Sequence, residues 1–311
     1  MRILIYGAGV LGSYLAHVLV RGGNDVTMLA RGKRAEELKQ DGLVIRHHIQ
    51  RKTTVDRTHV IESLADHDSY DLIFVVMKYT DFPAILPILA KNRSRNIILV
   101  GNNTDAHQME EYLQTHSDTS KHIAFGFQVS GGRREKDRMV AVRFGAGEMV
   151  IGGLNGDIPF KAVLDQAFAK TKYKLTYHDQ MDAWLKNHII PILGLNIATR
   201  IHGGQMNKVA RDTKLLRLAI EAVDEGFQVL ETLGYPLVPA KQAQFIRNRK
   251  SMMLVLLKIY HRLSVSRMID GNFSEIEALT RVFNDWKNEA SIPTPAWDQL
   301  QQLLKDKTGA V

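Results

Sequence analysis

The sequence predicts an α/β fold in which an N-terminal doubly wound parallel sheet is followed by an all-helical C-terminal domain. Three observations predict this fold class. A β-rich run at residues 2–6 leads into a glycine turn and then a helical stretch. Continuous apolar runs alternate with helical stretches through the first half of the chain. From about Asp179 onward strand signals vanish, and apolar residues recur every three or four positions.

The first half of the chain supplies the strands of the expected parallel sheet. Residues 25–30 form the second strand, and residues 71–77 and 96–100 are apolar throughout, as strands buried on both faces require. Alternation of strand and helix predicts β-α-β units, and therefore parallel strands. The intervening helices are expected at residues 34–41, 81–91 and 105–115.

Residues 122–153 have a different pattern, with short strands parted by glycines, and predict an antiparallel extension of the sheet. The expected strands are residues 123–127, 139–144 and 148–152. We place the domain boundary after residue 178, so that residues 1–178 form the nucleotide-binding domain and residues 179–311 the helical domain. The expected helical stretches of the second domain are residues 180–199, 212–233, 240–270, 273–290 and 294–306.

Composition limits the possible functions. The chain has 311 residues, no cysteine and a formal charge of +8. Disulfides and thiolate chemistry are therefore excluded, and no histidine spacing indicates a metal site, so we expect none. The basic residues are scattered, which favours small anionic ligands over nucleic acid or a membrane. Because Met1 leads directly into the first strand, we expect no signal peptide and a cytoplasmic protein.

The turn after the first strand carries the G-x-G-x-x-G spacing of dinucleotide-binding proteins at Gly7, Gly9 and Gly12. In that motif the first glycine makes the tight turn, the second admits the pyrophosphate, and the third lets helix and strand pack closely. The alternative is an ordinary glycine turn between a strand and a helix. The candidate cofactor-binding residues of the turn are Gly7, Ala8, Gly9, Val10, Leu11 and Gly12.

The residue that follows the second strand selects the dinucleotide. A carboxylate there favours NAD, whereas a cation accommodates the 2′-phosphate of NADP. Here the strand runs into Arg31, and no acidic residue occurs before Glu36. We therefore expect NADP(H), with Arg31 as a phosphate-binding residue. The alternative is a solvated basic loop.

Motifs along nearly the whole chain resemble those of the ketopantoate reductase (2-dehydropantoate 2-reductase) family. In the family's order they are GAGVLGSYLA, VTMLARG, VVMKYTD, LVGNNTD, MVIGG, W-x-K at residues 184–186 and SEIEAL at residues 274–279. The resemblance implies a Rossmann-type domain and an all-α domain of the 6-phosphogluconate-dehydrogenase-like type. It also implies an active site in the cleft between them.

The resemblance identifies Lys186 as the proton donor. Ile189, Ile190 and Leu193 share its helical face, and an apolar setting would lower the lysine pKa toward neutrality, as a general acid needs. The alternative is a lysine that extends to solvent at a domain edge.

Three further positions carry roles that the resemblance implies. Glu275 matches the family's active-site glutamate, although Asn272 three residues earlier also fits a helix capping box. Asn102 matches an asparagine that contacts nicotinamide and substrate, with Asn103 as a competitor for that role. Lys78 matches a lysine near the nicotinamide ribose, and a solvated strand-end lysine is the alternative.

Asn248 and Ser251 resemble the family's substrate-binding N-x-x-S-M run, but Glu275 then follows later than the family pattern expects. Helix-surface roles are the alternative for both. Ile190 and Gly194 stand where the family has asparagines, so the reaction class is better defined than the substrate.

The sequence as a whole predicts an NADPH-dependent reductase of a 2-keto acid, with 2-dehydropantoate as the expected substrate. Three alternatives remain: a non-catalytic NADP(H)-sensing protein, a related reductase acting on a different keto acid, and an enzyme that oxidises hydroxy acids or reduces imines. A homodimer is possible. For the apolar segment 251–257, we favour a place in the core over a dimer face.

Overall fold

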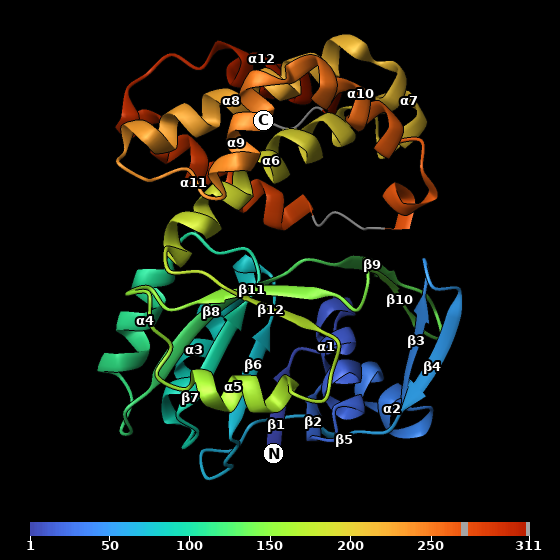
Figure 1. Ribbon diagram of the computed structural model, residues 1–311, viewed down its shortest axis with the longest axis vertical. Coiled ribbons are helices and arrows are strands. Elements are labelled where there is room, and N and C mark those ends of the chain that lie inside the picture. The colour runs from blue at the N-terminus through green and yellow to red at the C-terminus, as the bar shows by residue number, and fades with distance from the viewer. Residues whose placement is uncertain (269–272, 309–311) are drawn as a thin grey trace. The chain divides into compact units, whose positions relative to one another are not determined.

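The structure is a computed structural model that describes residues 1–268 and 273–308 (Figure 1). Contacts divide the described residues into two units. The first comprises Met1–Met181 with Met268, and the second comprises Asp182–Arg267 with residues 273–308. Asn272, the proposed capping residue for the segment around Glu275, lies outside the described residues.

An eight-stranded sheet forms the centre of the first unit (Figure 1). Its strand order is β12-β11-β8-β7-β6-β1-β2-β5. The expected parallel strands are all present, and two short strands, β5 and β12, were not expected. In sheet order the strands are β12 (Lys174–Tyr177), β11 (Glu148–Gly152), β8 (His122–Gln128), β7 (Asn96–Val100), β6 (Leu72–Val76), β1 (Arg2–Tyr6), β2 (Asp25–Leu29) and β5 (His59–Ile61).

The strand order reverses at β1, which pairs in parallel with β2 on one side and β6 on the other. In open parallel sheets, such a reversal opens a crevice at the carboxyl ends of the strands, and ligands bind there. The residues that follow Tyr6 and Val76 are therefore placed where the motifs require them.

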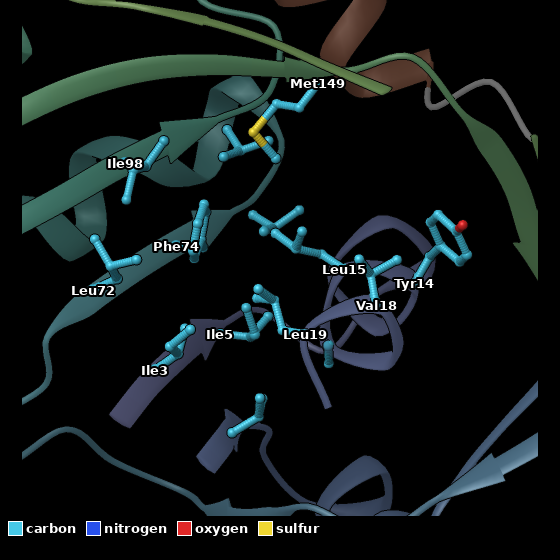
Figure 2. Packing of buried hydrophobic residues seen from close by; sticks show 14 of the residues in the cluster. Ile3, Ile5, Tyr14, Leu15, Val18, Leu19, Leu72, Phe74, Ile98 and Met149 are labelled. Atoms are coloured by element: carbon cyan, nitrogen blue, oxygen red, sulfur yellow. The ribbon is translucent and has the colours of Figure 1, made fainter. Parts of the chain in front are cut away.

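The core of this unit is built from strand residues that face helix α1 (Val10–Arg21). Figure 2 shows Ile5 of β1 and Phe74 of β6 beside Leu15 and Leu19 of α1. All four side chains are fully buried. Burying each of them contributes about 1.5–3 kcal/mol, so this face of the sheet fixes where α1 begins.

The expected antiparallel extension is only partly correct. β8 pairs in parallel with β7 and so continues the parallel sheet, whereas β11 is antiparallel to β8. β12 then pairs in parallel with β11. The third expected strand, near residues 139–144, belongs to a different sheet.

That second sheet has the strand order β4-β3-β10-β9 and was not predicted. β3 (Leu43–His47) and β4 (Lys52–Asp56) form an antiparallel hairpin, as do β9 (Gly131–Arg134) and β10 (Met139–Val142). The two hairpins join through a parallel pairing of β10 with β3. A buried contact between His17 Nδ1 and Asp56 Oδ2, 2.6 Å apart, links α1 to β4.

Most helices follow the predicted pattern, but α5 (Lys161–Phe168) and α7 (Met206–Arg211) were not expected. The expected single stretch at residues 240–270 is wrong, because the helix ends at Asn248 and a second one begins at Lys250. The helices of the first unit are α2 (Lys33–Gln40), η1 (Tyr79–Asp81), α3 (Phe82–Lys91), α4 (Ala106–Thr115) and α5 (Lys161–Phe168). Those that follow are α6 (Met181–Ile201), α7 (Met206–Arg211), α8 (Thr213–Thr232), α9 (Ala240–Asn248), α10 (Lys250–Tyr260), η2 (Ser264–Met268), α11 (Phe273–Ala290) and α12 (Pro295–Thr308).

This chain departs from the family pattern at Ile190 and Gly194 of α6, and both residues lie where α6 packs closely against α8. A Cβ on Gly226 would lie 2.5 Å from Ile190 Cγ2, and one on Gly194 would lie 2.8 Å from Val223 Cγ2. Ile190 is 3 % exposed. The Ile190 side chain and the absence of one at Gly194 therefore both serve helix packing, which explains why polar groups are absent there.

The segment 251–257 is not wholly core, contrary to the expectation. Leu254 and Leu257 are buried, but Met252, Val255 and Leu256 are each about half exposed. Among the described residues, no helix combines the length and apolar character needed to cross a membrane.

Candidate active site

The glycine turn lies between β1 and α1 at the reversal of strand order. Gly7 has φ +117°, and a Cβ there would overlap the carbonyl oxygen of Val76. A Cβ on Gly12 would overlap the carbonyl oxygen of Gly7. Gly9 is different, because no atom lies within 4 Å of a Cβ built on it. Gly7 and Gly12 are thus required by the fold, whereas packing leaves Gly9 open to a ligand.

A cavity of about 380 Å³ opens over this turn. Four residues of the turn line it, together with the end of β2 and Met77, which follows β6. Three arginines also line it: Arg31, Arg34 and Arg134. The cavity therefore offers the N-terminus of a helix and an excess of guanidinium groups to an anionic ligand. Its lining residues are Tyr6, Gly7, Ala8, Gly9, Val10, Leu29, Ala30, Arg31, Arg34, Met77, Arg134 and Met139.

Arg31, the residue predicted to bind phosphate, is exposed at this cavity. It also lines a neighbouring cavity of about 470 Å³, together with Tyr6, Leu64 and Ile88. Burial raises the pKa of the Tyr6 phenol, against the opposing effect of Arg31, so Tyr6 is neutral and presents an aromatic face. Its other lining residues include Glu62, Asp66 and Lys91, so this cavity combines an aromatic and aliphatic wall with charged groups at its rim.

A carboxylate that sequence reasoning missed organises the other two arginines. Glu37 accepts hydrogen bonds from Arg34 Nη1 at 3.2 Å and from Arg134 Nη2 at 2.8 and 2.9 Å. Burial raises the pKa of Glu37, but the two arginines lower it further, so the carboxylate titrates below its usual range. Arg34 and Arg134 come from α2 and β9, and only the second sheet brings them together.

Asn102 and Asn103, which compete for one role, have different surroundings. The Asn103 side chain accepts a hydrogen bond from the Asp105 amide at 2.8 Å and donates one to Met109 Sδ, so it serves the turn. Asn102 Oδ1 is buried, and it has no hydrogen-bond partner among the described residues. A buried acceptor without a partner is costly unless a ligand satisfies it, which favours Asn102 as the ligand-binding residue.

Lys78, at the other strand end, is exposed and forms the N-terminal boundary of η1. Its backbone carbonyl accepts a hydrogen bond from the Asp81 amide at 3.0 Å. The proposed contact of its side chain with a ribose stays a prediction.

In the second unit, Lys186 is 5 % exposed and lies on α6. Its Nζ donates a hydrogen bond to Asp182 Oδ1, one helical turn earlier, and lies 4.8 Å from the centre of the Tyr235 ring. The expectation of purely apolar surroundings is therefore wrong. The amine therefore lies between a carboxylate and the face of an aromatic ring.

The residues on either side of Lys186 pack and anchor α6, and His188 is not an alternative proton donor. The Trp184 ring stacks on His188, with centroids 4.8 Å apart. Burial lowers the pKa of His188 to about 4, so this imidazole is neutral near pH 7 and lacks the acidic proton of an imidazolium. The Asn187 amide donates to the carbonyl oxygens of Ala183 and Pro236, at 2.8 and 2.9 Å, and anchors α6 to the segment beyond Tyr235.

The remaining candidates lie on helices of the second unit. Glu275 is half-buried in the first turn of α11. Asn248 and Ser251 are exposed at the adjoining ends of α9 and α10, and Ser251 lines a small cavity with Glu221 and Lys250. Lys186 is not among the residues that line that cavity, so the substrate roles of Asn248 and Ser251 stay predictions.

Within the described parts of the chain, no cluster of three or more histidine, aspartate or glutamate side chains is arranged to hold a metal ion.

The glycine turn, the cation-lined cavity and the orphaned amide of Asn102 fit a nicotinamide dinucleotide, and the class of protein they define is a nicotinamide-dependent oxidoreductase. Residues 3–156 match the family model described as "Ketopantoate reductase PanE/ApbA". The chain belongs to the ketopantoate reductase family.

Curated relatives agree with this assignment. The chain is 24 % identical to the 2-dehydropantoate 2-reductase of Aquifex aeolicus over 315 residues, covering 99 % of this chain and 97 % of the relative. It is 26 % identical to an uncharacterized oxidoreductase, YkpB, of Bacillus subtilis over 262 residues, covering 81 % and 82 %.

Solved structures share the fold. A putative ketopantoate reductase from Ralstonia solanacearum has a TM-score of 0.76 at 16 % identity, covering 99 % of this chain and 98 % of its own. D-mandelate dehydrogenase, solved with NADH and anilino(oxo)acetate, has a TM-score of 0.76 at 14 % identity with the same coverage. A dimeric ketopantoate reductase from Staphylococcus aureus has a TM-score of 0.69 at 14 % identity, covering 99 % of both chains.

Proposed function

We propose that this protein reduces a 2-keto acid to the 2-hydroxy acid with NADPH, and that 2-dehydropantoate is the substrate. The buried Lys186–Asp182 pair carries the proposal, because it fixes an amine at the family's W-x-K position. The 2-dehydropantoate 2-reductase named among the relatives, matched over almost the whole chain, supports the substrate.

The cofactor site is proposed from the first unit alone. Gly9 and the amides that begin α1 would hold the pyrophosphate, and Arg31 would bind the 2′-phosphate that distinguishes NADP from NAD. Asn102 Oδ1 would accept a hydrogen bond from the nicotinamide carboxamide. When bound, the cofactor supplies the hydride for the keto carbon.

In this proposal, a residue of the second unit transfers the proton to the substrate oxygen. As the keto group is reduced, negative charge develops on its oxygen, and Lys186 Nζ stabilises that charge and donates the proton that completes the hydroxyl. Asp182 accepts a hydrogen bond from Nζ and would hold the amine in position. Glu275 is proposed to accept a hydrogen bond from the substrate hydroxyl.

A second candidate substrate is a keto acid with an apolar group near the carbonyl. Ile190 and Gly194 pack on α8, so they offer no hydrogen-bonding group to a substrate at two positions where the family carries asparagines. The mandelate dehydrogenase with the same fold acts as a precedent for an aromatic side chain in such a substrate.

A turnover assay over a panel of keto acids tests the proposal. We expect the purified protein to consume NADPH with 2-dehydropantoate and to release the 2-hydroxy acid, identified by chiral chromatography. Preference for benzoylformate, the keto acid of mandelate, would support the second candidate instead. Tight NADPH binding with no turnover on any keto acid would contradict both and favour the non-catalytic sensor.

We further propose that the protein is a homodimer that pairs through α10. Met252, Val255, Leu256 and Ile259 form one exposed stripe on this helix, each between 47 and 54 % exposed, and Leu263 extends it at 50 %. A two-fold axis would pair this stripe with the same stripe of a second copy and bury the apolar side chains of both.

Light scattering coupled to size-exclusion chromatography measures the expected dimer. Leu256→Glu should give a monomer of unchanged helical content, because a charge at the centre of the stripe cannot be buried without a partner. Phe144→Glu replaces an apolar side chain that is 80 % exposed in the first unit, and it should stay dimeric. A monomeric wild-type protein at micromolar concentration would refute the proposal.

A further inference from the structure

The β9–β10 hairpin of the second sheet forms one wall of the cavity over the glycine turn. Arg134 and Met139 are directly paired across the two strands, and both line the cavity. The hairpin approaches α1 closely, because a Cβ on Gly132 would lie 2.7 Å from Val10 Cγ1. A glycine at this position therefore lets β9 pass over the start of α1 and carry Arg134 to the cavity two residues later.

Arg134 reaches the cavity with most of its hydrogen-bonding capacity unused. Its two hydrogen bonds to Glu37 both come from Nη2, at 2.8 and 2.9 Å. Among the described residues, Nε and Nη1 have no hydrogen-bond acceptor, and the side chain is 46 % exposed. An arginine fixed at one end, with free donors at the other, is suited to bind phosphate.

The guanidinium of Arg34, in the same cavity, uses all three of its nitrogens in hydrogen bonds within the protein. Its Nε donates to the carbonyl oxygen of Ala8, Nη1 to Glu37 and Nη2 to Ser13 Oγ, at 3.2–3.3 Å. Burial lowers the pKa of this guanidinium, against the raising effect of Glu37. Arg34 therefore braces the glycine turn, and the positive charges left for a ligand are those of Arg31 and Arg134.

We propose that Arg134 is a second ligand of the cofactor 2′-phosphate, opposite Arg31, and that it confers part of the preference for NADPH over NADH. This inference rests on the proposed function, which takes NADPH as the cofactor. A phosphate monoester carries close to two negative charges at pH 7, and two guanidinium groups balance it. Glu37 neutralises part of the charge of Arg134 and Arg34 when no phosphate is bound, so three guanidinium groups can share one cavity.

The test compares the Kd of NADPH and of NADH, measured by titration of reduced-nicotinamide fluorescence. Arg134→Gln is expected to raise the Kd of NADPH by about 10–100-fold, the value of one charge-assisted phosphate contact, and that of NADH by less than about threefold. Arg138→Gln is the matched control. Arg138 lies at the turn of the same hairpin and pairs with Glu135 at 2.9 Å, away from the cavity, so its loss should change neither constant.

A second variant separates a phosphate contact from a folding defect. Arg134→Lys keeps the charge but loses the forked geometry, and its Kd for NADPH should lie between those of the wild type and Arg134→Gln. Equal weakening of NADPH and NADH by Arg134→Gln, or no change in either, would overturn the inference while leaving the proposed function intact. A wild-type protein that binds NADH as tightly as NADPH would instead show that the proposed cofactor itself is wrong.

Discussion

Replacing Lys186 by alanine should lower kcat with 2-dehydropantoate by about 10²–10⁴-fold, the usual contribution of a general acid. Lys186 is the amine held at the family's W-x-K position, and its neighbour His188 is neutral near pH 7 because burial lowers its pKa to about 4. The Kd of NADPH, whose proposed site lies in the first unit, should stay within about twofold of the wild-type value.

Lys186→Arg supplies the control for this prediction. Alanine at this position removes the amine of the Lys186–Asp182 ion pair, and loss of a buried ion pair can destabilise α6. Arginine keeps the ion pair and hence the fold, but its guanidinium does not release a proton near neutral pH. We expect the arginine variant to have wild-type stability and a kcat as low as that of the alanine variant. Full activity in both variants would remove Lys186 from the mechanism.

Gly9→Ala should abolish tight NADPH binding while leaving the protein folded. No atom lies within 4 Å of a Cβ at this position, and the φ of −73° suits alanine, so the methyl group enters only the cavity. It would occupy space that the pyrophosphate needs, and we expect the Kd of NADPH to rise by about 10–100-fold. Loss of a glycine N-cap costs up to ~1 kcal/mol, which lowers Tm by about 2–4 °C.

Gly12→Ala provides the opposite case within the same motif. Its Cβ would overlap the carbonyl oxygen of Gly7, a backbone atom that cannot move without displacing the turn. We expect a loss of about 3 kcal/mol or more, and a fall in Tm of roughly 6–12 °C, measured by circular dichroism. If Gly9→Ala lowered Tm as much as Gly12→Ala, or bound NADPH normally, the proposed location of the pyrophosphate would be wrong.

The sequence predicts the parallel sheet well because the signals there are local. Strands such as residues 72–76 and 96–100 are apolar throughout, and the glycine turn follows the first strand directly. The second sheet escapes prediction because its pairing is not local. β3 is charged at one end and β4 is polar along most of its length, and their partner β10 lies far along the chain.

In the candidate site too, the sequence predicts the residues that belong to local motifs and misses those that long-range pairing brings together. Lys186 and Arg31 are named by motifs, whereas Arg134 and Glu37 meet only because the second sheet brings β9 to α2. Asp182 is the one missed residue that the sequence signals, since it stands four positions before Lys186 and so shares its helical face. The choice of Asn102 over Asn103 needs atomic detail. The Asn103 Oδ1 atom already accepts a hydrogen bond from the Asp105 amide, whereas the Asn102 Oδ1 atom has no donor among the described residues.

The parallel pairing of β10 with β3 has a consequence for how the protein is made. β3 ends at His47 and β10 begins at Met139, so nearly half of the polypeptide must leave the ribosome before these strands can meet. Bringing such distant segments together carries a high entropic cost and is slow. The β3–β4 hairpin therefore has an unpaired edge during synthesis, and with the role proposed for Arg134 the nascent domain would gain its full affinity for coenzyme only after this residue has been translated and folded into place.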